Sequence, residues 1–224
     1  MHDTLLSPLK RQAFIAGIVL AVASVLEIAA MAHHPTVRSS ATAQAVQEIS
    51  TMAPLAALVH GALLAFMLVA AYGLSEFVLR RDVRRPLIRA GAIAYGAGVI
   101  VMLGAAMVSG FIVADLVRLT PHATTVDLQI NVQLLVLCRV LNQTWANFGV
   151  IAMSLGIALW SVDLLRDLGL PRLVGVLGLL VSAAPALALM LGLVHLDVHG
   201  MAAVVLLQAL WNIAIGLAMM RGRI

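Results

Sequence analysis

Six stretches of this chain are so long and so apolar that only a lipid bilayer, or one another, can bury them. They lie near residues 13–32, 55–78, 90–115, 131–162, 173–194 and 200–220. A helix of about 20 residues crosses the roughly 30 Å hydrocarbon core. Because lipid satisfies no backbone hydrogen bonds, all six should be α-helical. The sequence therefore predicts an all-α, polytopic membrane protein: one domain, residues 1–224, with six transmembrane helices.

Composition excludes several classes of function. Charged residues make up only 11% of the chain and hydrophobic residues 62%, whereas soluble domains average about 25% charged. A single cysteine, Cys138, excludes an intrachain disulfide, a CxxC pair and a four-cysteine metal site. The chain has no phosphate-loop, dinucleotide-binding, zincin or hydrolase-elbow motif. Its net charge is +4, but the basic residues lie between apolar runs, so we expect lipid and no nucleic acid as a partner.

Lysine and arginine predict the orientation. Of the 14 such residues, only Arg38 and Arg118 fall on one side, and Arg139 falls inside a predicted span. The remaining eleven share the opposite side: Lys10, Arg11, Arg80, Arg81, Arg84, Arg85, Arg89, Arg166, Arg172, Arg221 and Arg223. Because positive loops stay in the cytoplasm, both termini are predicted to be cytoplasmic.

Three ionisable residues lie inside predicted spans. Counted from the helix ends, Glu27, His60 and Arg139 should share one depth near the non-cytoplasmic face. A charge inside the membrane costs on the order of 2.5–3.5 kcal/mol on insertion scales and usually faces a polar interior. We therefore expect one common pocket in which Glu27 pairs with Arg139, and expect Arg139→Ala to destabilise the bundle.

Amide side chains extend this predicted pocket. In the fourth span a polar stripe repeats at i, i+3, i+4 and i+8 and comprises Arg139, Asn142, Gln143 and Asn147. A second polar edge in the sixth span comprises Gln208 and Asn212. Such stripes face inward. They serve either to bind a ligand or to join helices by interhelical hydrogen bonds.

Histidines gather on the non-cytoplasmic side. His195 and His199, at i and i+4 around Asp197, share one face if a helix continues through them. With His60 and Glu27 they would form a shell suited to zinc, copper or iron, or they would hold a b-type haem. The alternative is two solvated loop histidines. His33 and His34 are adjacent, so their side chains would diverge on a helix, and we expect no shared site there.

Two further segments carry structural expectations. The non-cytoplasmic loop 33–54 repeats Ala41, Ala45 and Ile49 at i, i+4 and i+8 after Ser39 and Ser40. This pattern favours a short interfacial helix, with an irregular loop as the alternative. The glycine- and alanine-rich run 90–115 predicts close helix packing, at the centre of the bundle or at a contact in a homo-oligomer.

The turn between the fourth and fifth spans resembles a known arrangement. Leu170-Pro171-Arg172 precedes a glycine-containing apolar helix, with proline at a first helical turn and arginine at the interface. This stretch resembles the corresponding connection in a large family of six-helix bacterial inner-membrane proteins. The resemblance implies the six-helix fold and a multi-pass inner-membrane location, and it implies no activity.

Three functions remain open from sequence. In the first, the pocket binds or transports a small polar or anionic ligand through Glu27, His60, Arg139 and the amides. In the second, the histidines make the chain a metal- or haem-dependent oxidoreductase. In the third, it is a structural or regulatory subunit of a membrane complex. Whether the chain is an enzyme is left open.

Overall fold

The chain folds almost entirely into helices. A computed structural model describes residues 8–36, 42–118 and 125–224, and these contain no strand. The elements, in order, are α1 (Pro8–Ala32), α2 (Thr42–Arg80), α3 (Pro86–Met107), a π-helical turn η1 (Val108–Ile112), α4 (Val113–Arg118), α5 (Thr125–Leu164), α6 (Leu170–Met190) and α7 (Val198–Met220). Six helical segments are long and apolar enough to span a membrane, with α3, η1 and α4 forming one of them. The predicted all-α, six-span fold is confirmed.

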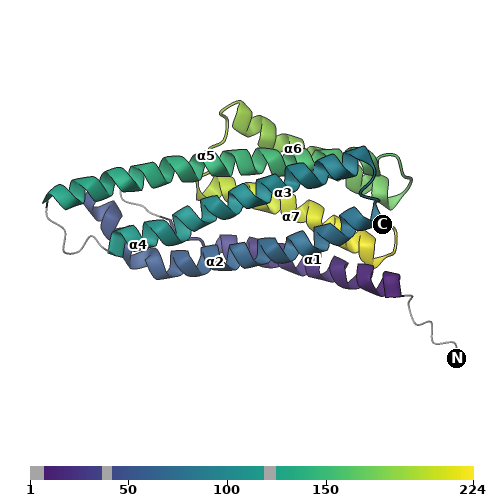
Figure 1. Cartoon of the computed structure of the whole chain (residues 1–224), viewed down its shortest axis with the longest axis horizontal. Helices are drawn as coiled ribbons and strands as arrows, with labels where there is room; N and C mark the ends of the chain where they lie inside the picture. The colour runs from purple at the N-terminus through teal and green to yellow at the C-terminus, as the bar shows by residue number, and fades with distance from the viewer. Residues whose placement is uncertain (1–7, 37–41, 119–124) are drawn as a thin grey trace.

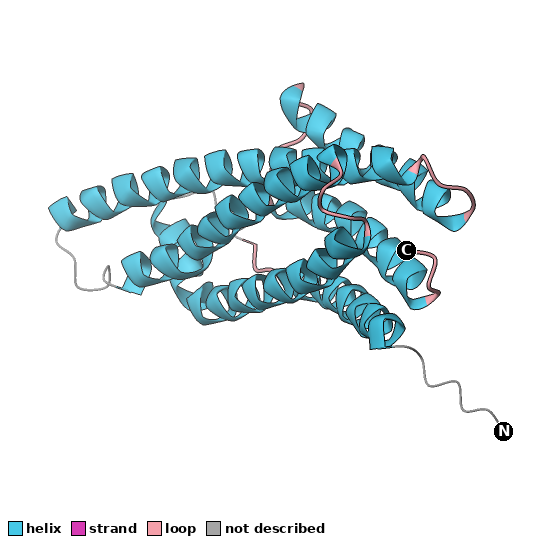
Figure 2. Ribbon diagram, turned by 45° about the vertical axis from the view of Figure 1, so that its right-hand side comes forward, coloured by secondary structure: helices cyan, strands magenta, loops and turns pink. Residues whose placement is uncertain are grey.

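The helices form an antiparallel bundle. Figure 1 places the start of α1 and the end of α7 at the same end of the bundle, which we call the terminal end; the opposite end is the distal end. Figure 2 shows the connections lying at the ends of the helices. The most extensive helix contacts are those of α3 with α5 and of α1 with α7, followed by α1 with α2 and α5 with α6.

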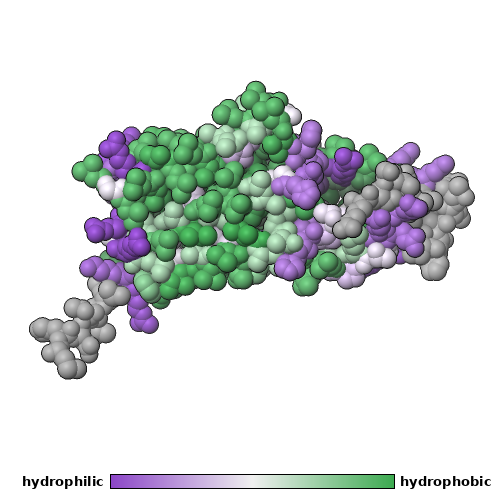
Figure 3. Space-filling view, turned by 180° about the vertical axis from the view of Figure 1, so that it is seen from behind, coloured by the Kyte–Doolittle hydropathy of each residue, from purple (hydrophilic) through white to green (hydrophobic). Residues whose placement is uncertain are grey.

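Two helices are much longer than a bilayer is thick. The 39 residues of α2 and the 40 of α5 correspond to lengths of about 60 Å, against a hydrocarbon core of roughly 30 Å. In Figure 3 hydrophobic residues cover the bundle next to the terminal end, and hydrophilic residues become frequent over its distal part. A separate small core joins α2, α4 and α5 there, comprising Ala53, Ala114 and Val117 with Val46, Ile49 and Leu135 against them. In their distal parts α2 and α5 therefore form, with α4, a three-helix projection that has a core of its own.

This projection replaces the predicted interfacial helix. Residues 42–54 are helical, but they continue without a break through Pro54 into the membrane span of α2. Val46 and Ile49 pack against the small distal core instead of against lipid. Ser39, Ser40 and Ala41 lie outside the described residues. The apolar repeat correctly predicted a helix, and the apolar face of this helix packs against other helices of the same chain.

Glycines bring α3 and α5 into close contact. A Cβ built on Gly98 would lie 2.8 Å from the carbonyl oxygen of Gly149, and one on Gly156 would lie 2.9 Å from that of Gly91. The same arrangement joins α1 to α7, where Gly17 and Gly216 face one another's carbonyl oxygens. The small residues of α3 thus serve contacts inside the bundle. Close backbone approach of this kind is how apolar helices gain packing energy without a hydrophobic driving force.

The Gly98 contact gives a first prediction. Gly98→Ala should force α3 and α5 apart, because both Met153 Cγ at 2.6 Å and the Gly149 carbonyl obstruct the new methyl group. We expect a loss of about 1–3 kcal/mol, the usual cost of overpacking. Gly96→Ala, on the same helix with nothing within 4 Å of the built Cβ, is the matched control. Thermal unfolding in detergent measures both; equal melting temperatures for the two variants would refute the contact.

Candidate functional site: a polar cavity inside the bundle

A cavity of about 310 Å³ lies between α1, α2, α3, α5 and α7. This volume is at the lower end of the range for small-molecule pockets, roughly 300–1,000 Å³. Much of the lining is apolar and includes five methionines: Met31, Met67, Met102, Met153 and Met201. Its polar lining comprises Glu27, His34, His60, Tyr95, Ser109, Asn142, Gln143, Asp197, Gln208 and Asn212. Among the described residues that line it there is no lysine or arginine.

Six of the seven ligand-binding candidates from sequence meet at this cavity. They are Glu27, His60, Asn142, Gln143, Gln208 and Asn212. The polar spacing along α5 and α7 therefore indicated which faces point inward. The stripe ends early, because Asn147 is exposed and is not part of the lining.

Arg139 is the exception. It is exposed, and none of the ion pairs within the described part of the chain joins it to Glu27. Arg139 lies one turn of α5 before Asn142, on the side away from the terminal end, and Asn142 is the first described residue of α5 that lines the cavity. Arg139 therefore lies just beyond the cavity, on the exposed surface of α5. The start of an apolar run does not fix the depth of a side chain to within one turn when the helix is longer than a bilayer is thick.

One face of α1 contributes three lining residues. Glu27, Met31 and His34 occur at i, i+4 and i+7, and all three line the cavity. The helical turn continues to His34, whose amide donates to the Met31 carbonyl at 3.1 Å. His33 is exposed, and its ring Nδ1 lies 2.8 Å from the Ala29 carbonyl oxygen on its own helix. The two adjacent histidines do diverge, as expected, and the divergence directs His34 into the cavity.

His34 meets His60 at the distal end of the cavity. Their Nε2 atoms are 3.3 Å apart, and the rings pack edge to face with centroids 4.8 Å apart. Ser109 Oγ lies 2.8 Å from His60 Nε2. His60 is 7% exposed, and Gly110 packs directly on its Cβ. Burial lowers the pKa of His34 below its usual value, opposed by a hydrogen bond to the Pro35 carbonyl, so the imidazole is predominantly neutral at pH 7.

Sequence reasoning missed this histidine pair. Counting from the helix ends placed His60 in the pocket, but α1 and α2 are joined by a separate segment, and nothing in the sequence fixes how the end of α1 is rotated against α2. The glycine at 110 was a usable signal, since a close approach of η1 to α2 requires it.

Each of the two innermost amide side chains has one atom without a hydrogen-bond partner. Gln208 is 8% exposed and Asn212 is 2% exposed. Gln208 Nε2 and Asn212 Oδ1 make no hydrogen bond within the described part of the chain. Tyr95 lies near Asn212 and near the charge of Glu27. A buried polar atom without a partner costs about 1–3 kcal/mol, so these amides are suited to a bound molecule or ordered water.

Gln143 has a different role. Its Nε2 donates to the carbonyl of Leu196 at 2.9 Å, across 53 residues of sequence. Leu196 and Asp197 belong to the connection between α6 and α7 and also line the cavity. Gln143 therefore holds this connection at the distal end of the cavity. Joining parts of the bundle was the second of the two roles that the sequence allowed for these amides.

Aromatic residues close the other end. Trp160 and Trp211 stack with centroids 5.9 Å apart, and Phe77 packs edge-on against both. All three are essentially inaccessible to solvent, and Trp160 Nε1 donates to the Ile88 carbonyl at 3.0 Å. Both α2 and α5 run toward the terminal end, and Phe77 and Trp160 follow the last lining residues of these helices, Ala70 and Met153, so the aromatic cluster lies between the cavity and the terminal end.

His195 and His199 lie apart from the cavity lining. Both are exposed, and α7 begins only at Val198, so no helix carries both on one face. Asp197 instead caps α7, accepting from the Gly200 amide at 2.8 Å. That hydrogen bond, with the nearby charges of His199 and His195, lowers the pKa of Asp197. Within the described residues no three His, Cys, Asp or Glu side chains gather as a metal site, so the predicted set of Glu27, His60, His195 and His199 is not brought together.

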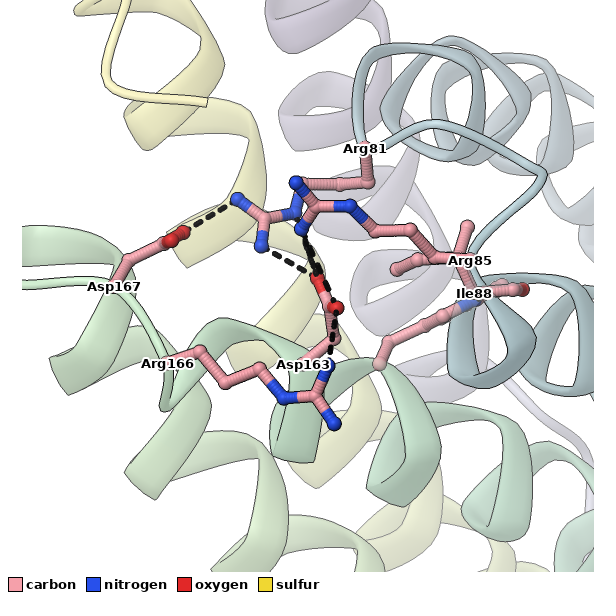
Figure 4. A network of polar contacts seen from close by, with 7 residues as sticks. Arg81, Arg85, Ile88, Asp163, Arg166 and Asp167 are labelled. Carbon is pink, nitrogen blue, oxygen red and sulfur yellow. Dashed lines mark hydrogen bonds and ion pairs between the residues drawn. The ribbon is translucent and has the colours of Figure 1, made fainter.

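A second polar cluster lies at the terminal end. Asp163, near the end of α5, is fully buried and accepts from Arg81 Nε at 3.1 Å and from Arg81 Nη2. Arg85 and Arg166 approach the same carboxylate at 3.4 and 4.0 Å, and Arg81 also binds Asp167. Figure 4 shows the three arginines converging on Asp163. Burial alone would lower the pKa of Arg81, but its bonds to both aspartates raise it.

This cluster is structural. It ties the turn after α2 to the turn after α5, and no part of it lines the cavity. Glu76 and Arg80 form a further ion pair at 2.9 Å, and Gln12 of α1 donates to the same carboxylate at 3.0 Å. Asp163 was not predicted from the sequence, although an acidic residue within an apolar run and next to an arginine-rich turn was an available signal.

No family model, curated protein or solved structure matches this chain. The resemblance of the turn around Leu170–Arg172 therefore assigns it to no family.

The positions of the arginines give a second prediction, which reverses the expectation from sequence. Arg81→Ala should destabilise the protein by about 3 kcal/mol, the lower end of the range for breaking a buried ion pair, because Arg85 and Arg166 still face Asp163. Arg139→Ala should change stability by no more than about 0.5 kcal/mol, as at other exposed sites. Thermal unfolding in detergent compares the two variants. A large loss of stability in Arg139→Ala would contradict this prediction and support an ion pair between Arg139 and Glu27.

Proposed function

We propose that this multi-pass membrane protein binds a small, neutral or cationic molecule in its intramembrane cavity. The observation that carries the proposal is a pair of buried amide atoms without a partner, Gln208 Nε2 and Asn212 Oδ1, at the inner end of the cavity. A ligand with one acceptor and one donor satisfies both atoms and recovers their desolvation cost. The apolar and methionine lining accommodates the body of such a molecule.

The charge of the lining selects the ligand class. Glu27 and Asp197 contribute carboxyl groups, and the described lining contains no lysine or arginine. The anionic ligand considered from sequence depended on Arg139 as its counter-charge, and Arg139 lies outside the cavity. Electrostatic complementarity therefore favours a cation or a neutral polar molecule.

The closed terminal end supports binding over transport. The end of the cavity that faces the distal part of the bundle is lined by His34, Leu196 and Asp197. The space beyond its opposite end is filled by Phe77, Trp160 and Trp211. We place the protein in a bacterial inner membrane with both termini in the cytoplasm, the orientation that the positively charged loops favour. The ligand then enters from the non-cytoplasmic side. Passage across the membrane would additionally require the aromatic cluster to open.

Matched probes test the ligand class. Benzyltrimethylammonium and benzenesulfonate share an aromatic body and carry opposite charges. At pH 8 in detergent the cation should raise the melting temperature of the wild type and the anion should not, because a ligand stabilises the state that binds it, by about 2.7 kcal/mol at 100 times Kd. Equal stabilisation by both ions would contradict the proposed charge preference.

Two leucine variants test the position. Asn212→Leu should abolish the response to the cation and still fold, because it replaces a buried amide whose Oδ1 atom has no partner with an apolar group of similar volume. Asn147→Leu, at an exposed position on α5, should respond as the wild type does. A cation response retained in Asn212→Leu would place the binding site elsewhere.

A further inference from the structure

The ring nitrogens of His34 and His60 have an unusual arrangement. The Nδ1 atom of His60 lies 2.8 Å from the Ala56 carbonyl oxygen, and that of His34 lies 2.9 Å from the Pro35 carbonyl oxygen. A carbonyl oxygen only accepts, so each Nδ1 must carry the hydrogen. In the neutral form of both rings, each Nε2 then presents a lone pair.

The two Nε2 atoms lie close together. They are 3.3 Å apart, and the single hydroxyl hydrogen of Ser109 is shared between His60 Nε2 at 2.8 Å and the Ala105 carbonyl at 3.1 Å. Two unprotonated ring nitrogens at this separation repel one another in a buried site. A proton or a metal ion between the two nitrogens removes this repulsion.

The geometry is that of a metal site. Two nitrogens bound at about 2.0–2.1 Å to a tetrahedral ion lie roughly 3.4 Å apart, so the 3.3 Å separation of the two Nε2 atoms matches that of a bound pair. Metal-binding histidines usually donate their second ring N–H to a backbone carbonyl or carboxylate, which fixes the tautomer. Both histidines here have such a carbonyl.

We propose that His34 and His60 bind a divalent late first-row metal ion, Zn²⁺ or Cu²⁺, at the distal mouth of the cavity. Imidazole is the preferred ligand of both ions. Ser109 provides a nearby oxygen donor, and Glu27 and Met31 lie along the same face of α1 within the same cavity. With only two imidazoles, the ion keeps open positions toward the cavity, as catalytic or exchangeable sites do and closed structural sites do not.

This site differs from the one suggested by sequence spacing. His34, adjacent to the exposed His33, takes the place of His195 and His199, and His60 is common to both. It does not depend on the small-molecule ligand proposed above, because the amides of Gln208 and Asn212 lie on α7 and take no part in it.

Metal binding to the full chain tests the inference. The protein, purified in detergent through a tag without histidine and stripped with a chelator, is dialysed separately against Zn²⁺ and Cu²⁺, and bound metal is counted by mass spectrometry. We expect about one ion per chain for at least one of the two. Co²⁺ should give the visible absorption of a tetrahedral complex. Substoichiometric metal in every case would overturn the proposal and leave a shared proton between the rings.

Three variants locate the site. His34→Gln should weaken binding by more than about 100-fold, beyond the roughly 10–100-fold effect of losing a second-shell partner. His33→Gln, one residue away and exposed, should bind as the wild type does. Asn212→Leu should also retain the metal, so failure of the ligand proposal and failure of this one are distinguishable. Unchanged binding in His34→Gln, or equal losses in His33→Gln and His34→Gln, would refute the site.

His60→Gln provides a second ligand variant. Because His60 is buried beneath Gly110, this variant is read only alongside its thermal unfolding, whereas His34 lies at a helix end where glutamine is tolerated. A folded His60→Gln that retains wild-type affinity would also refute the site.

Discussion

The close approach of helix backbones at paired glycines is the constraint on which the rest of the structure depends. Gly91 and Gly98 of α3 meet Gly156 and Gly149 of α5, and Gly17 meets Gly216 where α1 crosses α7. In lipid, such contacts gain packing energy that side chains at those positions would prevent. They create two tightly joined helix pairs, α3 with α5 and α1 with α7. The cavity lies between these pairs, where longer side chains keep the helices apart.

The two ends of that space are closed by different chemistry. At the terminal end, stacked tryptophans fill the interior, and Asp163 holds the turns together through Arg81. At the distal end the closure is polar and partial, made by Gln143 holding the Leu196 carbonyl and by the histidine pair. Buried ion pairs add little net stability and are costly to break. Asp163 therefore fixes the terminal end, where the described contacts are the more numerous and more deeply buried.

The fold was largely predictable because its determinants are local. Six apolar runs require six helices, and inward polar spacing on α5 and α7 correctly identified Asn142, Gln143, Gln208 and Asn212 as cavity residues. What failed depends on lengths and rotations that single-sequence patterns do not contain. Arg139 was misplaced because α5 continues past the cavity, so that a residue one turn before Asn142 is exposed. His34 was missed because its role depends on how the end of α1 is rotated against α2, and Asp163 because its three arginines come from two different turns.

The cavity holds two kinds of polar group with incomplete hydrogen bonding, and the two kinds differ in the partner that would satisfy them. The amides of Gln208 and Asn212 lack a donor and an acceptor, which a neutral molecule or water supplies. The facing Nε2 atoms of His34 and His60 are two acceptors beside one hydroxyl donor, that of Ser109, and a proton or a metal ion between them would satisfy both. Buried polar groups are normally satisfied internally. Because the two kinds of group lie at separate places in one cavity, a molecule at the amides and an ion at the histidines would bind independently of each other.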